Sequence, residues 1–367
     1  MGLSLNPAHE LCMLIDAMRA AARDGRPAAL ATITATRGAT FRRAGARMLV
    51  GADGSAVCEL SGGCPQRDIV QRAQQAIVSG RPELACYNAD SGLDVLMEMG
   101  CGGELDVLIE PLVDPRTDAF FDVLTHALES RRSVLAATLF ARDGEVVPPR
   151  RALWCSGEWC FDDLGDAGLR DAVLHATASD HIARAATLRL PATNGTADVL
   201  IERIGPRHAL VAIGSNATAR ALLSAGHALG WRTTLVDSNP ERLQETMPPP
   251  GVHAVHATPQ TLRDMLPFDR YSSVVVMTHN LAQDLAWLAA LRDVPVAYLG
   301  AIGSRERTSR MLRDLSPPIV GLHAPAGFDI GSETPAEIAL AITAEIIAVL
   351  NGRNGGPLRD GGGTLHA

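Results

Sequence analysis

The pattern of hydrophobic and polar positions divides the chain into a first part with a mixed pattern and a second part with a regular one. In the first part, an amphipathic helix that begins at Pro7 is followed by a buried strand, a hairpin, a second helix and a closing strand. These four later elements are predicted over residues 28–36, 46–60, 65–79 and 105–110. We therefore expect a mixed α/β domain in this part.

The first part also contains an internal repeat. Ala31-Thr32-Ile33 recurs as Ala137-Thr138-Leu139, and Asp106-Val107-Leu108-Ile109-Glu110 recurs as Asp198-Val199-Leu200-Ile201-Glu202. The recurring segments keep their order and their element types. Self-similarity of this kind is typical of a duplicated structural unit. We therefore predict that the α/β domain consists of two copies of one scaffold.

From His208 onwards, strands alternate with segments of helix length. The strands are predicted over residues 209–213, 232–236, 252–256, 273–277, 296–299 and 319–322. Connections of this length join parallel strands, so the pattern predicts a Rossmann-like, doubly wound parallel sheet. The expected organisation is a duplicated α/β domain over 1–204, with copies at about 29–111 and 134–204, a Rossmann-like domain over 208–353 and a disordered, Gly-rich tail over 354–367.

Composition narrows the possible functions. A net charge of −8 without a long basic run argues against nucleic-acid binding. The chain has no lysine, which excludes a Walker A loop and Schiff-base chemistry. No apolar run reaches the roughly 18 residues of a membrane span, and the N-terminus does not resemble a signal peptide. Seven cysteines are expected to be reduced in a cytoplasmic protein, and the role of Cys155 and Cys160 stays open, with a zinc site as one alternative.

The strongest candidate site is Ser61-Gly62-Gly63-Cys64, immediately before a predicted helix. Free N–H groups at a helix N-terminus attract anions and lower the pKa of a thiol placed there. The alternative is a Gly-Gly turn beside an ordinary buried cysteine. The repeat favours a site. An offset of 103 residues pairs Cys64 with Ala167, so the second copy has the same scaffold without the cysteine, and packing does not require a cysteine there. Cys101, in a mirrored Cys-Gly-Gly, is a candidate second thiol.

Three arginines, Arg42, Arg43 and Arg47, lie in or beside a glycine-bearing loop before the hairpin. Arginine binds phosphate and carboxylate groups through two parallel hydrogen bonds, and no lysine is present to share this role. The loop is therefore a candidate anion cradle near the cysteine. A solvated surface loop is the alternative.

In a doubly wound sheet, ligands bind beyond the carboxyl ends of the strands. The residues expected at that edge are Gly214, Ser215, Asn216, Asp237, His279, Gly303, Ser304, Arg305 and His323. The first turn is a degraded dinucleotide fingerprint, because Asn216 stands where a glycine would admit a pyrophosphate. Asp237 follows roughly 20 residues later, where an acid binds a ribose 2′-OH, although it could equally cap a helix.

Taken together, these blocks resemble the xanthine dehydrogenase accessory protein family, XdhC/CoxI. The resemblance covers most of the chain and rests on Arg42–Val50, Ser61–Cys64, Cys101–Gly103, Leu299–Arg305 and His323–Gly331. The chain departs from the family at Pro65-Gln66, at Asn216 and at Asn280. Membership implies an XdhC-like N-terminal domain followed by a Rossmann domain.

The resemblance also implies a function. The chain would bind molybdenum cofactor, support its sulfuration and deliver it to a molybdenum hydroxylase of the xanthine dehydrogenase type, with a cysteine desulfurase as a further partner. Cys64 would then ligate molybdenum through the cofactor, and the chain would act as a chaperone without multiple turnover. The alternative is an NAD-dependent oxidoreductase that acts on a small substrate at the interface of the two domains. The client, the form of the cofactor and the existence of a homo-oligomer stay open.

Overall fold

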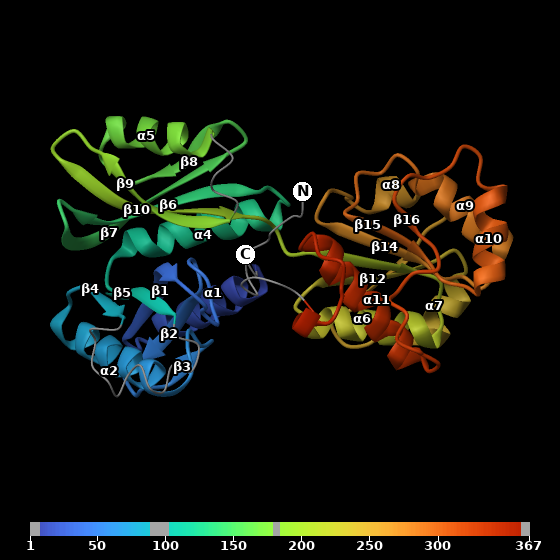
Figure 1. The fold of residues 1–367 in the computed structure, drawn as a ribbon, viewed down its shortest axis with the longest axis horizontal. Helices are drawn as coiled ribbons and strands as arrows, with labels where there is room; N and C mark the ends of the chain where they lie inside the picture. The colour runs from blue at the N-terminus through green and yellow to red at the C-terminus, as the bar shows by residue number, and fades with distance from the viewer. Residues whose placement is uncertain (1–7, 89–102, 179–183, 361–367) are drawn as a thin grey trace. The chain divides into compact units, whose positions relative to one another are not determined.

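The computed structural model describes residues 8–88, 103–178 and 184–360. These residues fall into two compact units, an N-terminal unit within Leu5–Pro206 and a C-terminal unit within Arg207–Pro357. Figure 1 shows the N-terminal unit in blue to green and the C-terminal unit in yellow to red.

The first half of the N-terminal unit is a five-stranded antiparallel sheet with two helices. Its elements are α1 (Ala8–Arg23), β1 (Ala28–Arg37), β2 (Arg47–Gly51), β3 (Ala56–Val57), α2 (Gly63–Ser79), β4 (Glu83–Tyr87) and β5 (Glu104–Pro111). The strand order is β3-β2-β1-β5-β4. The hydrophobic pattern did not predict the edge strand β4.

The second half repeats this arrangement after the linking helix α4 (Pro115–Glu129). Its elements are β6 (Val134–Arg142), β7 (Glu145–Cys155), β8 (Glu158–Asp162), α5 (Ala167–Ala178), β9 (Ala185–Pro191) and β10 (Thr196–Ile204). The strand order β8-β7-β6-β10-β9 matches that of the first sheet strand for strand. The duplicated α/β fold predicted from the repeat is therefore confirmed.

The two copies also agree in the detail of their strand pairing. Thr32 lies opposite Leu108 in the first sheet, and Thr138 lies opposite Leu200 in the second. The register shifts just beyond Ile33 in the first sheet and just beyond Leu139 in the second. A β-bulge is a specific local feature that redirects a strand, so its recurrence shows that the copies share one scaffold geometry.

In each copy, one face of the sheet is covered by the copy's own helix and the other face lies in a core that both copies share. On the outer face, α2 covers the first sheet and α5 covers the second, each over its own apolar cluster. The inner faces of both sheets share one core with α1 and α4, in which Leu30, Leu124 and Ala136 are almost fully buried. Burial of both inner faces in a common core makes the two copies one folding unit.

Two buried ion pairs connect the copies in a reciprocal way. Arg47 of the first copy pairs with Glu202 of the second, and Arg151 of the second pairs with Glu110 of the first. The two arginines occupy equivalent positions, opposite Thr32 and Thr138 in their sheets. All four side chains are no more than 8% exposed. Such an exchange of equivalent contacts is the rule at a two-fold interface between identical protomers, so the copies pack with two-fold pseudosymmetry.

The cysteines follow the expectation only in part. Cys155 and Cys160, at the hairpin of β7 and β8, form a disulfide, which corrects the prediction that all seven cysteines are reduced. The hairpin brings these two residues together because its turn lies between them. Cys12, Cys58 and Cys86 are not part of a disulfide. No cluster of three or more His, Cys, Asp or Glu side chains suited to a metal ion occurs among the side chains that the structure describes.

The C-terminal unit is a six-stranded sheet in which every neighbouring pair of strands is parallel. Its strands are β11 (Ala209–Ile213), β12 (Arg232–Asp237), β13 (His253–His256), β14 (Ser272–Val276), β15 (Tyr298–Ala301) and β16 (Leu322–His323), in the order β13-β12-β11-β14-β15-β16. Its helices are α6 (Ala217–Ala228), α7 (Pro240–Thr246), α8 (Leu262–Met265), α9 (Leu281–Leu291), α10 (Arg305–Asp314) and α11 (Pro335–Leu350). The Rossmann-like fold predicted from the alternating pattern is confirmed.

Helices cover both faces of this sheet. The cores contain α6 and α11 on one face and α8, α9 and α10 on the other. Helix α11 begins at a capping box, in which Thr334 and Glu337 exchange hydrogen bonds. Beyond it, Gly355 lies against the ring of Phe328, so this part of the expected disordered tail contacts the unit. No helix within 8–88, 103–178 or 184–360 combines the length and the hydropathy of a membrane span.

Candidate functional site

The turn before α2 is built from glycine and braced by Gln66. Gly62 is extended, with φ −103° and ψ 169°, and Gly63 takes a left-handed φ of 64° that favours glycine. Gln66 Oε1 accepts hydrogen bonds from the N–H groups of Leu60 and Ser61, at 3.2 and 3.3 Å. A glutamate at position 66 would accept the same two hydrogen bonds. The glutamine at which this chain departs from the family pattern therefore preserves the shape of the turn. The backbone of Cys64 lies in the first turn of α2, while its side chain is outside what the structure describes.

The corresponding helix start in the second copy contains a carboxylate. Asp166 Oδ1 accepts from Leu169 N at 3.0 Å, and Oδ2 accepts from Thr193 N at 2.9 Å. The backbone hydrogen bonds from Thr193 and Leu169 lower the pKa of the Asp166 carboxyl group. In the first copy, Gly62 has no side chain to serve as a cap. The two copies therefore differ in charge at the same place.

The burial pattern refines the alignment of the two helices. Pro65 and Ile69 are the buried residues that begin α2, and Leu169 and Val173 take the same positions in α5. This alignment places Gly168 opposite Cys64, which corrects the predicted match with Ala167. The cysteine is absent from the second copy in either alignment.

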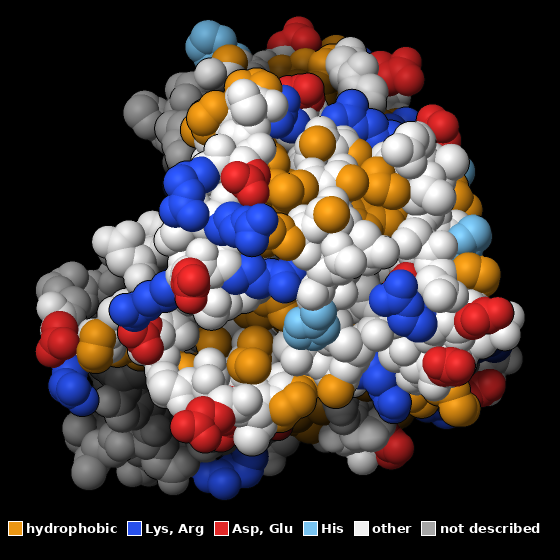
Figure 2. Space-filling model, turned by 90° about the vertical axis from the view of Figure 1, so that its right-hand side faces the viewer, with side chains coloured by type: hydrophobic (Ala, Val, Ile, Leu, Met, Phe, Trp, Pro, Cys, Tyr) orange, Lys and Arg blue, Asp and Glu red, His pale blue; other side chains and the backbone are white. Residues whose placement is uncertain are grey.

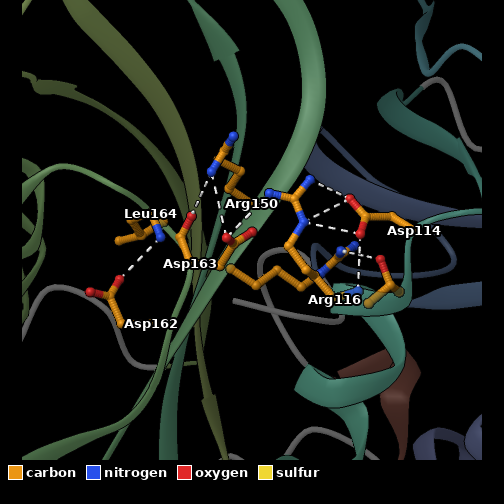
Figure 3. A network of polar contacts seen from close by, with 8 residues as sticks. Asp114, Arg116, Arg150, Asp162, Asp163 and Leu164 are labelled. Carbon is orange, nitrogen blue, oxygen red and sulfur yellow. Dashed lines mark hydrogen bonds and ion pairs between the residues drawn. The ribbon is translucent and has the colours of Figure 1, made fainter.

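The chain that leads to α5 is held by charged contacts, shown in Figure 3. Arg116 pairs with Asp114, the N-cap of α4, and reaches Asp163 at 3.3 Å. Arg150 also approaches Asp163, at 3.5 Å, from β7. These ion pairs fix the segment before α5 against the linking helix α4 and against β7.

We expect the carboxylate of Asp166 to stabilise α5 in a pH-dependent way. Replacing Asp166 by alanine should lower the free energy of unfolding by about 1–2 kcal/mol at pH 7, the usual effect of losing an N-cap. Because the folded pKa is lowered, the stabilisation is complete above the ordinary carboxyl pKa and is lost as the pH falls through the folded value. Thermal melting of the wild-type chain and of Asp166→Ala at pH 7 and at pH 3 tests this. An equal difference in melting temperature at the two pH values would contradict the prediction.

The three predicted arginines do not form one cradle. Arg47 is buried in the pair with Glu202 and also donates to the carbonyl of Gly45, so we remove it from the cradle. Its strand turns this side chain towards the second copy. Arg42 is half-buried and pairs with Glu10 of α1, which raises the pKa of the Arg42 guanidinium through their hydrogen bond.

A further arginine from the second copy joins Arg42 and Arg43. Burial, with added repulsion from Arg43 and Arg42, lowers the pKa of Arg184 to about 10. Like charges gathered in a half-buried place are expected where an anion binds. The sequence did not point to Arg184, because nothing local distinguishes it and it lies far along the chain from the loop.

Gly103, the last residue of the Cys-Gly-Gly motif, packs against the loop that contains Arg42 and Arg43. A Cβ atom at Gly103 would overlap the carbonyl oxygen of Ala39 and approach Thr40 Cγ2 at 2.6 Å. Only glycine allows this close approach of two backbones. Cys101 and Gly102 themselves lie outside the described residues.

At the carboxyl edge of the C-terminal sheet, the first turn is closely packed. Gly214 has φ 116°, and a Cβ there would lie 2.7 Å from the carbonyl oxygen of Met277. Asn216 caps α6 by accepting from Ala219 N at 2.9 Å, and its amide donates to Met277 O at 2.7 Å. The Asn216 side chain therefore occupies the start of the helix, where a phosphate binds in a Rossmann fold.

Asp237 is engaged by the main chain. Its two carboxylate oxygens accept from Ser215 N and Asn239 N, both at 2.8 Å, and the residue is only 4% exposed. These bonds hold together the turns that follow β11 and β12. The residue does not cap α7, because Asn239 does so.

A half-buried arginine, paired with a buried carboxylate, holds the backbone of His279 at the same edge. His279 is exposed and has a left-handed φ of 59°. Arg307 donates to the His279 carbonyl at 3.0 Å and pairs with Asp284, which also accepts from Thr278 Oγ1 at 2.6 Å. Neither Asp284 nor Arg307 was predicted, although a charged residue within the apolar sequence of α9 is a signal that could have been used.

The remaining predicted residues separate into two groups. Ser304 caps α10, and Arg305, after Gly303, is exposed and pairs with Asp329 at 3.3 Å. His323 at the end of β16 pairs instead with Glu345 of α11. Figure 2 shows the side on which α9 and α10 lie in Figure 1, where basic side chains in blue and a histidine in pale blue border hydrophobic ones in orange.

Comparison with known proteins places this architecture in a family. A family model described as the XdhC and CoxI family matches residues 21–88, and one described as the XdhC Rossmann domain matches residues 210–346. Together the two models cover more than half of the chain.

Individual relatives agree with these matches. A protein of Bacillus subtilis (strain 168) named as a probable xanthine dehydrogenase subunit is 28% identical over 326 residues, which cover 88% of this chain and 93% of that protein. Uncharacterized protein YqeB of Escherichia coli (strain K12) is 34% identical over 169 residues, 44% of this chain, and the match spans only 31% of that protein. A crystal structure of a xanthine dehydrogenase from Bacillus halodurans has a TM-score of 0.74 at 26% identity, with 93% of this chain and 96% of that chain covered. The chain therefore belongs to the XdhC and CoxI family.

Proposed function

We propose that the chain is an accessory protein of a molybdenum hydroxylase of the xanthine dehydrogenase type, and that its first copy binds molybdenum cofactor. The name of the Bacillus subtilis relative and the family support the partner. The observation that carries cofactor binding is the difference between the copies, because the second fills its helix start with the Asp166 carboxylate and the first leaves that start to Gly62.

The residues of the first copy suit the chemistry of this cofactor. Its phosphate would lie at the N-terminus of α2, with Ser61, Gly62 and Gly63 giving close backbone approach. Arg42 and Arg43, together with Arg184 from the second copy, would supply positive charge for the same anion. Cys64, with Cys101 as a second thiol, would offer a soft thiolate ligand to molybdenum.

The same role includes support for sulfuration of the cofactor and its delivery to the hydroxylase. A cysteine desulfurase would supply the sulfur. The chain itself holds and protects the cofactor and has no need of multiple turnover. The bound molybdenum would supply the redox chemistry only after delivery to the client.

Substitutions at Gly62 test the proposal through charge alone. No atom lies within 4 Å of the position that a Cβ would take at Gly62, and its backbone is extended, so a side chain fits there. Gly62→Asp would reproduce the carboxylate of the second copy and should reduce the molybdenum and pterin content of purified protein at least about tenfold, because a like charge opposes the phosphate. The measurement is metal analysis and pterin fluorescence of protein from a molybdenum-replete host.

Gly62→Asn is the matched control, since asparagine caps a helix without bringing a charge. It should retain the cofactor content of the unchanged chain. Both variants should melt at or above the wild-type temperature. Full cofactor content in Gly62→Asp would contradict binding at this helix start.

The geometry gives less support to the NAD-dependent oxidoreductase. Asn216 covers the start of α6, and both oxygens of Asp237 accept main-chain hydrogen bonds instead of facing a ribose. A dinucleotide would have to displace these contacts.

A further inference from the structure

A histidine in the C-terminal unit is held in one orientation by a half-buried carboxylate. His323 Nδ1 lies 2.9 Å from Glu345 Oε1, and its ring stacks on that of Tyr298, with the ring centres 4.4 Å apart. The second carboxylate oxygen, Oε2, accepts from Tyr298 Oη at 2.6 Å and from Gly327 N at 2.7 Å. Three elements, β15, β16 and α11, therefore fix one imidazole.

The charges of the partners determine which ring nitrogen carries the hydrogen. Burial alone would raise the pKa of Glu345, but hydrogen bonds from His323, Tyr298 and Gly327 lower it below the ordinary value. Burial, followed by contact with Glu345, raises the pKa of Tyr298, so the phenol remains a donor. An ionised Glu345 can only accept, and His323 must donate to it through Nδ1–H.

The other ring nitrogen is then a proton acceptor. Nε2 of His323 makes no hydrogen bond to any residue that the structure describes, and the side chain is 29% exposed. A carboxylate behind an imidazole fixes its tautomer and stabilises the protonated ring when a proton arrives. A histidine that served only packing would not need an ionised carboxylate held by two further donors.

We propose that His323 Nε2 is the proton-accepting group of a ligand site at the carboxyl end of β16, and that the ligand presents an acidic O–H or N–H group. The proton passes from the ligand to Nε2, the ligand keeps the electron pair as an anion, and Glu345 balances the charge of the imidazolium. Glu345 and Tyr298 are positioning residues in this arrangement. The inference concerns the C-terminal unit and does not require the cofactor to bind at α2.

The first test reads the tautomer directly. Nitrogen-15 NMR of the histidine-labelled full chain at alkaline pH, where imidazole rings are uncharged, should show His323 with hydrogen on Nδ1 and none on Nε2. Glu345→Gln should convert this single state into a mixture, because the glutamine amide can accept from Nδ1–H through its oxygen or donate to a bare Nδ1 through its NH2 group. A hydrogen on Nε2 in the unchanged chain would overturn the proposal.

The second test asks whether the acceptor is used. His323→Gln keeps a side-chain N–H for Glu345 but removes the basic nitrogen, so it should melt like wild type and yet reduce activation of a molybdenum hydroxylase by about 10²-fold, the lower range for loss of a general base. Tyr298→Phe should have a smaller effect of the same kind. His256→Gln, at an exposed histidine of β13, is the control and should activate normally.

The two proposals fail in different ways. If His323→Gln retains full molybdenum content but loses activation, the proton acceptor acts after cofactor binding. If His323→Gln activates its client like wild type across pH 5.5 to 9, the acceptor is not used and this inference is overturned. A chain without bound molybdenum would refute the cofactor proposal, while the tautomer would still decide this one.

Discussion

Replacing Glu202 by alanine should lower the free energy of unfolding of the N-terminal unit by about 3–5 kcal/mol, because it leaves the buried guanidinium of Arg47 without its counter-charge. The reciprocal substitution Glu110→Ala should have a similar effect, since it strands Arg151 in the equivalent place. Urea denaturation, with hydrogen exchange of β1 and β6 amides to report on this unit alone, provides the measurement. Similar losses for both variants would reflect the two-fold pseudosymmetry.

An exposed pair serves as the control for this prediction. Arg189 and Asp198 form a salt bridge with the arginine side chain 64% exposed, so Arg189→Ala should change stability by no more than about 1 kcal/mol. The double variant Arg47→Met with Glu202→Leu should be near neutral, because apolar side chains of similar volume can replace a buried pair. A small effect of Glu202→Ala would mean that water reaches Arg47 and that the copies are not joined by this contact.

Replacing Cys64 by alanine should abolish activation of the client hydroxylase while changing the free energy of unfolding by only about 1 kcal/mol, the size of an average substitution. The functional loss is expected because the thiolate at the start of α2 is the proposed ligand of molybdenum. The small stability effect is expected because α5 of the second copy forms with Gly168, which has no thiol, at the matching position. Thermal melting and client activation measured on the same preparation test both parts.

The other cysteines give the controls. Cys101→Ala examines a mechanism with two thiols and should reduce activation if both are needed. Cys12→Ala and Cys86→Ala, on α1 and at the edge strand β4, should leave activation unchanged. Normal activation by Cys64→Ala, or a loss that follows unfolding, would show that the turn has only a structural role.

Local patterns were sufficient for most of the fold. The alternation after His208 predicted six strands for the parallel sheet, of which the last two begin two and three residues later than predicted, and the repeat around Ala31 and Ala137 predicted two sheets of one design. Both succeed because the period of burial along a strand or helix is a property of neighbouring residues. The edge strand Glu83–Tyr87 was missed, because it is short and is defined mainly by its pairing with β5.

The sequence predicted the candidate site only in part, as it did the fold. The glycines of the turn before α2 and the cap at Ser304 follow from residue types that favour particular backbone shapes. The functions of cysteine and arginine in the turn remain proposals, since they depend on a ligand. Tertiary structure nevertheless changed which arginines belong to the cradle.

The sequence by itself determined the elements, the duplication and the Rossmann pattern, whereas only the tertiary structure decided the partners of the charged groups. Arg42 and Arg47 are five positions apart and chemically identical, yet one pairs half-buried with Glu10 and the other is buried against Glu202, 155 residues away. His323 likewise gains its orientation from Glu345 on another element. A strand's periodicity sets which side chains share a face, but contacts between distant segments determine which face is buried and which charge meets it there.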